Sequence, residues 1–364
     1  MINRIKLFIG NIKRKRCVPQ MYSKYLLPGE YVFDDSLSFL YHKNDVNASM
    51  LLKNNYAKIT MSRSWFRKLA NYIIKFLCFQ PVFIAAPSPG KKPYFQGTLF
   101  QIGTDRKEHK IFNLQNNEIL LLFPDIQAYD RKIRHYKQFK PYFPIPDIMA
   151  CNKNELLIIE RFIPAKEVNE WTHTDYMNVM ADVFQRDIVY LKQCKESNAY
   201  LQKSLEDILQ TISRDSHLVC YILGNISVTA ITEKIPFVEL HGDLWSSNIL
   251  IDKSGHEKIY YIDWEKTRPY MFYYDIFYLL LNECFIRQNY TYAEKYLSGE
   301  LDEILSSIFQ IFGFQYEPEH RFDYLYLALL NQYIERWANK SRKEERRIAE
   351  KWKFIFQKLA EMKY

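Results

Sequence analysis

Two kinds of hydrophobic spacing divide the chain. Between residues 94 and 162 the apolar positions form short runs separated by polar turns, which is typical of β-strands. One polar helical stretch, Ile126–Phe139, interrupts these runs and is closed by prolines. The predicted strands are 94–100, 109–114, 118–123, 147–150 and 155–160. The order β-β-β-α-β-β predicts a small antiparallel sheet with one helix.

Beyond Pro164 the spacing becomes helical. The predicted helices cover roughly 174–195, 198–213, 215–223, 272–287 and 322–337, and the last helix carries Ile348, Trp352, Ile355, Leu359 and Met362. A β-rich patch, Phe237–Trp264, interrupts this helical half. We therefore predict an α+β protein with an antiparallel-sheet lobe followed by a mainly helical lobe.

The first ninety residues form a separate, partly helical extension in this interpretation. Residues 61–79 have the spacing of an amphipathic helix, and Pro87–Gly90 marks a break. We place the sheet lobe at 91–163 and the helical lobe at 164–364. At 364 residues the chain is long enough for two such lobes.

The positive charge of the chain concentrates at the N-terminus. The net charge is +8, and residues 1–29 contain seven basic side chains and no acidic one. Such a run suits an anionic membrane surface or a phosphorylated substrate, or it is a solvated tail. No nucleic-acid-binding signature accompanies it, so we expect no nucleic-acid partner.

The cysteines and the apolar stretches indicate the compartment. Six cysteines stand far apart without a Cys-x-x-Cys pair, which favours reduced thiols in a cytoplasmic protein. The N-terminus lacks the apolar core of a signal peptide. The most apolar stretch, Leu69–Ala86, is interrupted by polar residues and Pro81, so we predict no membrane span. Peripheral attachment through the basic N-terminus stays open.

The candidate chemistry lies in the β-rich patch. His241-Gly242-Asp243 is followed by Asn248, and a second run ends in Ile262-Asp263-Trp264-Glu265. Phosphoryl transfer needs a carboxylate that orients the attacking hydroxyl and oxygen ligands that hold Mg²⁺ on the nucleotide. Asp243, Asn248 and Asp263, which flank two apolar strands, provide one base and two metal ligands within a single hairpin-like unit.

This pattern resembles the aminoglycoside phosphotransferase and choline kinase family, which is related to protein kinases. The resemblance implies a bilobal protein-kinase-like fold, with ATP as co-substrate and Mg²⁺ as cofactor. It implies that Asp243 is the catalytic base and that Asn248 and Asp263 are the magnesium ligands. His241 would brace the loop, and Asp275 would anchor it from the next helix.

The resemblance also assigns the nucleotide site. The run Glu155–Ile163 is similar to the last strand and hinge of the family's ATP-capping lobe. Backbone groups from Glu160 to Phe162 would then bind the edge of the adenine. The resemblance covers roughly residues 94–290 and is most specific in the catalytic loop.

Two family features are missing. Kinases hold the α- and β-phosphates with a strand lysine that pairs with a helix glutamate. The strand 118–123 has no lysine, and the helical segment 128–136 has no glutamate. Lys110 on the neighbouring strand, partnered by Asp130, is our candidate for the missing cation, since adjacent strands lie about 5 Å apart. An ordinary exposed strand lysine is the alternative.

The predicted function is ATP-dependent phosphate transfer to a hydroxyl of a small molecule. Two alternatives remain: a nucleotide-binding pseudokinase or scaffold, and a basic adaptor at a membrane surface. A carboxylate-and-aromatic acceptor pocket would suit a cationic amino alcohol or aminoglycoside, whereas a sugar or cell-envelope saccharide is equally compatible. The candidate lining residues are Trp245, Glu265, Tyr270, Glu283, Glu335 and Trp337.

Overall fold

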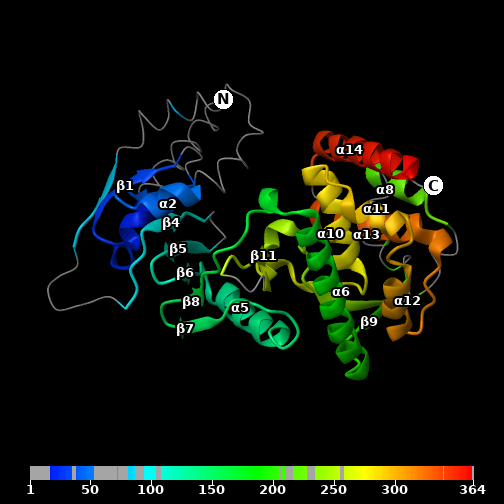
Figure 1. Ribbon diagram of the computed structural model, residues 1–364, viewed down its shortest axis with the longest axis horizontal. Helices are drawn as coiled ribbons and strands as arrows, with labels where there is room; N and C mark the ends of the chain where they lie inside the picture. The colour runs from blue at the N-terminus through cyan, green and yellow to red at the C-terminus, as the bar shows by residue number, and fades with distance from the viewer. Residues whose placement is uncertain are drawn as a thin grey trace. The chain divides into compact units, whose positions relative to one another are not determined.

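The computed structural model forms two compact units. The N-terminal unit contains Met1–Arg134 and Pro146–Pro164, and the C-terminal unit contains His135–Ile145 and Ala165–Tyr364. The structure describes residues 17–34, 38–52, 72, 81–86, 94–103, 108–204, 207, 209, 216–227, 234–254, 258–338 and 340–362. Figure 1 shows the two units with their elements labelled.

An antiparallel sheet forms the centre of the N-terminal unit. Among the described residues its strand order is β3-β1-β2-β4-β5-β6-β8-β7. The strands are β1 Gly29–Phe33, β2 Phe39–His42, β3 Val82–Ile84, β4 Leu99–Gln101, β5 His109–Asn113, β6 Glu118–Leu122, β7 Ile148–Asn152 and β8 Leu157–Arg161. The five strands from β4 onward, together with helix α5 (Ile126–Phe139), confirm the predicted β-β-β-α-β-β order.

The sheet is larger than predicted, because three of its strands come from the segment that we had set apart. Strands β1, β2 and β3 all lie within residues 1–90, and β2 pairs with β4. In β1, alternate side chains are buried: Tyr31 and Phe33 pack with Phe100 and Leu120 on one face of the sheet. The predicted helix 61–79, the break at 87–90 and most of the basic run lie outside the described residues.

Helix α5 covers the opposite face of the sheet. Asp125 accepts a hydrogen bond from the N–H of Ala128 (2.8 Å), which satisfies a donor that the first turn leaves unpaired. Tyr129 of α5 packs with Leu121 of β6 and Ile158 of β8. The same α5-facing surface of the sheet carries Glu160, because Glu160 pairs with Ile119 two residues from the Ile158–Leu121 pair.

The C-terminal unit is mainly helical, as predicted. Its helices are α6 His173–Glu196, α8 His217–Leu223, α10 Tyr274–Asn282, α11 Thr291–Leu297, α12 Asp302–Ile311, α13 Arg321–Arg336 and α14 Arg342–Glu361. A capping box between Thr172 and Asp175 begins α6. No helix among the described residues is both long and apolar enough to cross a bilayer. The α+β fold class, with an antiparallel sheet followed by a mostly helical region, is confirmed.

Some predicted helices differ in detail. The segment expected as helix 198–213 begins with a short strand, β9 Leu201–Lys203. The segment expected as one helix over 272–287 is α10 followed by a π-helical turn, η6 Glu283–Arg287. Short π segments often occur at functional sites. The helices α11 and α12 were not predicted.

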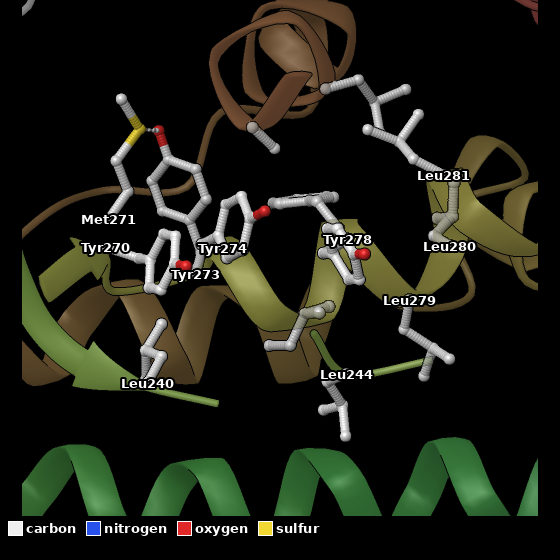
Figure 2. Close-up of a cluster of buried hydrophobic side chains, with 14 of the residues drawn as sticks. Leu240, Leu244, Tyr270, Met271, Tyr273, Tyr274, Tyr278, Leu279, Leu280 and Leu281 are labelled. Atoms are coloured by element: carbon white, nitrogen blue, oxygen red, sulfur yellow. Dashed lines mark hydrogen bonds between the residues drawn. The ribbon is translucent and has the colours of Figure 1, made fainter. Parts of the chain in front are cut away.

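A dense aromatic core supports the β-rich patch. Strand β10 (Ile235–Leu240) pairs with β13 (Arg268–Met271) and β9, and β11 (Ile249–Ile251) pairs with β12 (Ile259–Tyr261). Figure 2 shows Leu240 and Leu244 close to Tyr270, Tyr274 and Tyr278. The rings of Tyr270 and Tyr274 stack with centroids 4.4 Å apart. The segment that carries the candidate chemistry therefore rests on rigid packing.

Candidate active site

The loop between β10 and β11 is held by one buried carboxylate. Asp275, in the first turn of α10, accepts the backbone N–H of His241 (2.8 Å) and of Gly242 (2.9 Å). Gly242 has a φ of +74°, and a Cβ at this position would lie 2.4 Å from the Tyr270 ring. A residue with a side chain would therefore be strained here and would also collide. This loop conformation requires glycine.

His241 is buried and supports the conformation of the loop through two hydrogen bonds. Its Nε2 donates to the carbonyl of Ile262 (2.8 Å), and its Nδ1 accepts the N–H of Asp243 (3.2 Å). One donated and one accepted bond correspond to a neutral imidazole. Burial lowers the pKa of His241, although the charges of Asp263 and Asp243 oppose the shift. His241 thus ties the loop of Asp243 to the residue before Asp263.

The Asp243 carboxylate has two partners from distant helices. Its Oδ1 accepts the hydroxyl of Tyr278 on α10 (2.7 Å) and a guanidinium N–H of Arg336 at the end of α13. The Arg336 guanidinium also lies over the Tyr278 ring, 4.8 Å from its centroid. The side chain of Asp243 is 18% exposed and that of Arg336 is 30% exposed. A ligand can therefore reach this pair.

Asn248 and Asp263 lie beside each other across the β11–β12 hairpin. The N–H of Ile262 donates to the carbonyl of Asn248 (3.0 Å), and Asp263 is the next residue. The Asn248 Nδ2 donates to the carbonyl of Asp243 (2.7 Å), which leaves the amide Oδ1 as the atom suited to a metal. Asp263 has a φ of +66°. A positive φ at a residue other than glycine often marks a functional site.

This donor set fits Mg²⁺. Carboxylate and amide oxygens are its usual protein ligands, and the ion keeps several waters, so it needs few protein groups. The described residues contain no cluster of three or more His, Cys, Asp or Glu that would instead indicate a transition-metal site.

The end of the Asp263 segment is fixed by α5 residues of the same unit. His135 donates from Nδ1 to the carbonyl of Trp264 (2.8 Å), and Phe139 stacks on the Trp264 ring with centroids 4.3 Å apart. Trp264 itself is buried. The strain at Asp263 is thus held in place by packing on the following residue.

An arginine that sequence reasoning did not select also contacts the loop that carries Asp243. Arg287, at the end of η6, donates to the hydroxyls of Ser246 (2.8 Å) and Ser247 (3.0 Å), and its guanidinium lies 5.7 Å from the Trp245 ring centroid. Glu283, one turn earlier, accepts the N–H of Ser246 (3.3 Å). The π-helical turn therefore positions both groups against residues 245–247.

Two buried carboxyl groups lie behind the loop. Burial raises the pKa of Asp275 to about 7, against the opposing effect of the Gly242 and His241 N–H bonds. Burial and the charge of Asp275 raise the pKa of Asp187 on α6 well above its ordinary value. Both groups thus favour the protonated form more than an exposed aspartate does.

In the N-terminal unit the cation predicted from sequence has a different partner. Lys110 forms an ion pair with Glu108 (3.0 Å), whereas Asp130 pairs with Lys153 (3.0 Å) on the surface. The expected Lys110–Asp130 pair is therefore wrong, because Asp130 faces solvent and not the strand. Lys110 does lie on the same face of the sheet as Glu160, by its register with Leu121.

The structure instead shows a lysine–glutamate pair in which the lysine is on the helix and the glutamate is on a strand, the reverse of the arrangement in kinases. Lys132 is in the middle of α5, and its Nζ lies 2.6 Å from Oε1 of Glu160 on β8. The two side chains are 19% and 11% exposed. Burial alone would lower the pKa of Lys132, but the charges of Glu160 and Glu108 more than offset it, and the pKa is raised. Lys132 is therefore charged at neutral pH.

The backbone after β8 offers less to an adenine than expected. The N–H of Arg161 donates to the carbonyl of Asp147 (2.9 Å), and the N–H of Phe162 donates to the carbonyl of Asn117 (2.8 Å). The Phe162 N–H is thus occupied. Among the described residues the backbone bonds include none from the N–H of Ile163, the next position along the chain.

Several residues expected to line an acceptor pocket are buried. Glu283 is 0% exposed and Tyr270 is 1% exposed, so neither side chain is accessible to solvent in this structure. Trp337 packs with Phe285 and Trp352. Glu265 is exposed, Trp245 is half-buried, and the side chain of Glu335 lies outside the described residues. The expected carboxylate-rich pocket is therefore not what surrounds Asp243.

The family comparison agrees with the catalytic segment. The model of the phosphotransferase enzyme family matches residues 192–306, which include Asp243, Asn248, Asp263 and Asp275. The resemblance of this segment to the family of aminoglycoside and choline kinase-like phosphotransferases is confirmed. A comparison with functionally curated proteins gives no significant match.

Several solved structures are similar to this chain at low identity. The aminoglycoside phosphotransferase APH(4)-Ia, in a ternary complex with ADP and hygromycin B, is 16% identical with a TM-score of 0.44 over 71% of this chain and 92% of its own. A choline/ethanolamine kinase family protein from Mesorhizobium loti is 11% identical with a TM-score of 0.36 over 72% and 87%. The macrolide 2'-phosphotransferase MphH from Brachybacterium faecium is 14% identical with a TM-score of 0.38 over 68% and 88%. Similarity this low does not identify a function.

Proposed function

We propose that this protein transfers the γ-phosphate of ATP to a hydroxyl group of a small molecule. The observation that carries the proposal is the catalytic segment itself. One glycine loop, anchored by Asp275, presents Asp243, and the adjacent hairpin presents Asn248 and Asp263. The family match over residues 192–306 supports this reading.

Asp243 is the proposed base. Its carboxylate orients the acceptor hydroxyl and accepts its proton as the new O–P bond forms. The bond between the γ-phosphorus and the β,γ-bridging oxygen breaks, and ADP leaves with that oxygen. The Tyr278 hydroxyl, 2.7 Å from Oδ1, holds the carboxylate in one orientation. Such positioning is the main contribution a protein makes to phosphoryl transfer.

Asn248 and Asp263 are the proposed ligands of Mg²⁺. When bound, the ion neutralises charge on the nucleotide phosphates. The Asn248 Nδ2 bond to the carbonyl of Asp243 fixes the amide orientation, and the packing of Trp264 fixes the strained Asp263 backbone. Both ligands are therefore preorganised.

Lys132, together with Glu160, is the proposed substitute for the strand lysine that is missing from β6. A kinase needs one cation, steadied by a carboxylate, for the α- and β-phosphates. The Lys132–Glu160 pair supplies both, but the lysine is on the helix and the glutamate on the strand. For the adenine edge we propose the N–H of Ile163, because that of Phe162 is occupied.

The proposed acceptor is an amino alcohol, an aminoglycoside, a sugar or a cell-envelope saccharide. Asp243→Asn tests the activity, because asparagine keeps the shape but cannot accept the proton. We expect phosphate transfer, or slow acceptor-free ATP hydrolysis, to fall about 10²–10⁴-fold while ATP affinity changes little. Asp130→Asn, on the exposed pair with Lys153, is the control. Retained turnover in Asp243→Asn would refute the assignment.

The absence of a lysine from β6 is the specific observation that supports the alternative of a nucleotide-binding pseudokinase. That protein would be stabilised by ATP and Mg²⁺ but would form no product with any acceptor. A melting-temperature screen with ATP and Mg²⁺, repeated on Asp263→Ala, shows binding, and product analysis separates the two functions. A ligand at 100 times its dissociation constant stabilises a protein by about 2.7 kcal/mol.

A further inference from the structure

We propose that the acceptor carries an anionic group, a phosphate or a carboxylate, beside the hydroxyl that reacts, and that Arg336 binds this group. The inference rests on the proposed phosphotransferase function. It narrows the acceptor to an anionic saccharide or a similar acidic alcohol.

The first argument is the place of Arg336. Its guanidinium donates to Oδ1 of Asp243, the carboxylate that we propose accepts the proton of the acceptor hydroxyl. A guanidinium has five N–H donors, and the side chain is 30% exposed, so donors remain accessible to a ligand. An acceptor that binds beside Asp243 must therefore meet this cation.

The second argument is charge complementarity around the catalytic loop. Arginines from three separate segments contact residues 242–247 or their immediate support. Besides Arg336, Arg287 binds Ser246 and Ser247. Arg268 of β13 donates to the hydroxyl of Tyr270 (3.1 Å), whose ring lies against Gly242. Guanidinium groups remain charged at all physiological pH values.

Two of the carboxylates that could balance these arginines, Glu283 and Asp275, are buried. Glu283 is fully buried, and burial raises its pKa even though Ser246 and Arg287 oppose the shift. Asp275 is buried behind the loop and bonds to backbone N–H groups. Exposed Glu265 is followed by exposed Lys266. The half-buried carboxylate of Asp263 is assigned to Mg²⁺, so outside the proposed metal site the described side chains near Asp243 carry an excess of arginines, which opposes a cationic acceptor.

An anionic acceptor also resolves the pairing of Arg336 with the base. A phosphate or carboxylate on the acceptor offers the guanidinium a bidentate partner. When Arg336 turns to that partner, the Asp243 carboxylate loses a competing cation and becomes a better acceptor for the proton of the hydroxyl. A neutral or cationic acceptor offers no such exchange, and Asp243 then stays paired with Arg336.

The experiment is a binding titration in the presence of Mg²⁺ and a saturating non-hydrolysable ATP analogue, which fills the donor site. The probes are inorganic phosphate, glucose 6-phosphate and glucuronate as anions, glucose as the neutral control and glucosamine as the cation. We expect at least one anionic probe to bind at least tenfold more tightly than glucose or glucosamine. Glucose 6-phosphate against glucuronate then separates a phosphate from a carboxylate requirement.

Arg336→Gln should lower the affinity for that anion about 10- to 100-fold, whereas Arg346→Gln, on the exposed face of α14, should leave it unchanged. Arg336→Lys keeps the charge without the planar fork, so we expect an intermediate affinity. Should Arg336→Gln fail to fold, the lysine variant gives the same comparison.

The inference is wrong if no anion binds, if glucosamine binds as well as the anions, or if anion affinity survives in both Arg336 variants. It is also wrong if these variants slow acceptor-free ATP hydrolysis without changing anion affinity, because Arg336 would then serve the donor phosphate. Stabilisation by the ATP analogue in the same samples reports the proposed function separately. Where the analogue does not bind, the titration is made without it.

Discussion

The segment that carries the proposed catalytic residues, in the C-terminal unit, and the sheet of the N-terminal unit match the kinase pattern to different degrees. In the catalytic segment Asp243, Asn248 and Asp263 stand in the order that the family pattern leads one to expect, and backbone bonds fix each of them. In the sheet the expected lysine and glutamate are absent from their positions. A lysine–glutamate pair is still present, with its two elements exchanged.

The difference follows from what each region must do. A base and two metal ligands must meet one reacting group within a few tenths of an ångström, so their backbone positions are strongly constrained. A cation that binds a phosphate needs only to bring its charge close to the phosphate oxygens. A long lysine side chain can do so from either a strand or a helix.

The largest effect is expected where the catalytic segment depends on one residue. Asp275→Asn puts an amide NH₂ against the N–H of His241 or Gly242 and leaves one of these buried donors without an acceptor. We expect the free energy of unfolding to fall by about 1–3 kcal/mol and turnover to fall at least tenfold. Chemical denaturation and an ATP hydrolysis assay measure both.

Asp302→Asn, at the start of α12 outside the catalytic segment, is the matched control and should leave turnover intact. Turnover that is equally insensitive to both substitutions would show that the anchor is dispensable. The proposed difference between a strongly constrained catalytic segment and a sheet that tolerates exchanged residues would then be wrong.

A smaller effect tests the exchanged pair. Lys132→Met should weaken ATP binding about 10- to 100-fold, because a charged hydrogen bond to phosphate contributes roughly 1.5–3 kcal/mol. Lys153→Met, which removes a surface partner of Asp130, should not change ATP binding. Calorimetric titration with ATP and Mg²⁺ measures the affinity. Unchanged affinity in Lys132→Met would leave Lys110 as the candidate cation.

Exchanging the two residues of the Lys132–Glu160 pair tests which orientation the site needs. Lys132→Glu alone faces Glu160 with a like charge, and Glu160→Lys alone faces Lys132. Each should destabilise the protein, because a partly buried charge then loses its partner and faces a like charge. Together they restore a glutamate on the helix and a lysine on the strand. We expect the double variant to recover stability, and its ATP affinity shows which orientation the site needs.

The smallest effect concerns pH. The pKa of Asp187 is raised in the folded protein, so the folded state binds more protons than the unfolded state above about pH 4. This group therefore stabilises the fold least at high pH, and its contribution is lost as pH rises through the folded pKa. Asp187→Asn cannot ionise.

We therefore expect Asp187→Asn to flatten the fall in unfolding free energy as the pH rises above about 4, with little change at the acid end. Urea denaturation across that range measures it. A pH profile identical to that of the parent would show that Asp187 does not titrate there.

The features that could be predicted from the sequence differ between the same two regions. The strands 109–113 and 118–122 were predictable as short apolar runs between polar turns, and the helix 126–139 was predictable because prolines close a polar helical stretch. The catalytic loop was predictable because its residues lie close together along the chain. The strands β1 to β3 were not predicted, because the alternation at 29–33 covers only five residues and follows a strongly basic segment.

The side chains that sequence reasoning missed share one property: their partners are distant in the chain. Arg336 lies 93 residues from Asp243, and no spacing rule connects an α13 arginine to a β10 loop. Lys132 was not predicted, because the kinase pattern places a glutamate and not a lysine on that helix. Glu283 and Tyr270 were expected to face a ligand, but their burial depends on the packing of several elements and not on local pattern.

The three strands that precede β4 alter the mechanics of the sheet in the N-terminal unit. With β2 on one side and β5 on the other, β4 has neighbours along both edges, and its amide groups are committed to them. Strand β4 therefore cannot separate from the sheet without breaking its hydrogen bonds to both neighbouring strands. We therefore expect its amide hydrogens to exchange slowly with solvent. Nucleotide would then enter without a breathing motion of this strand.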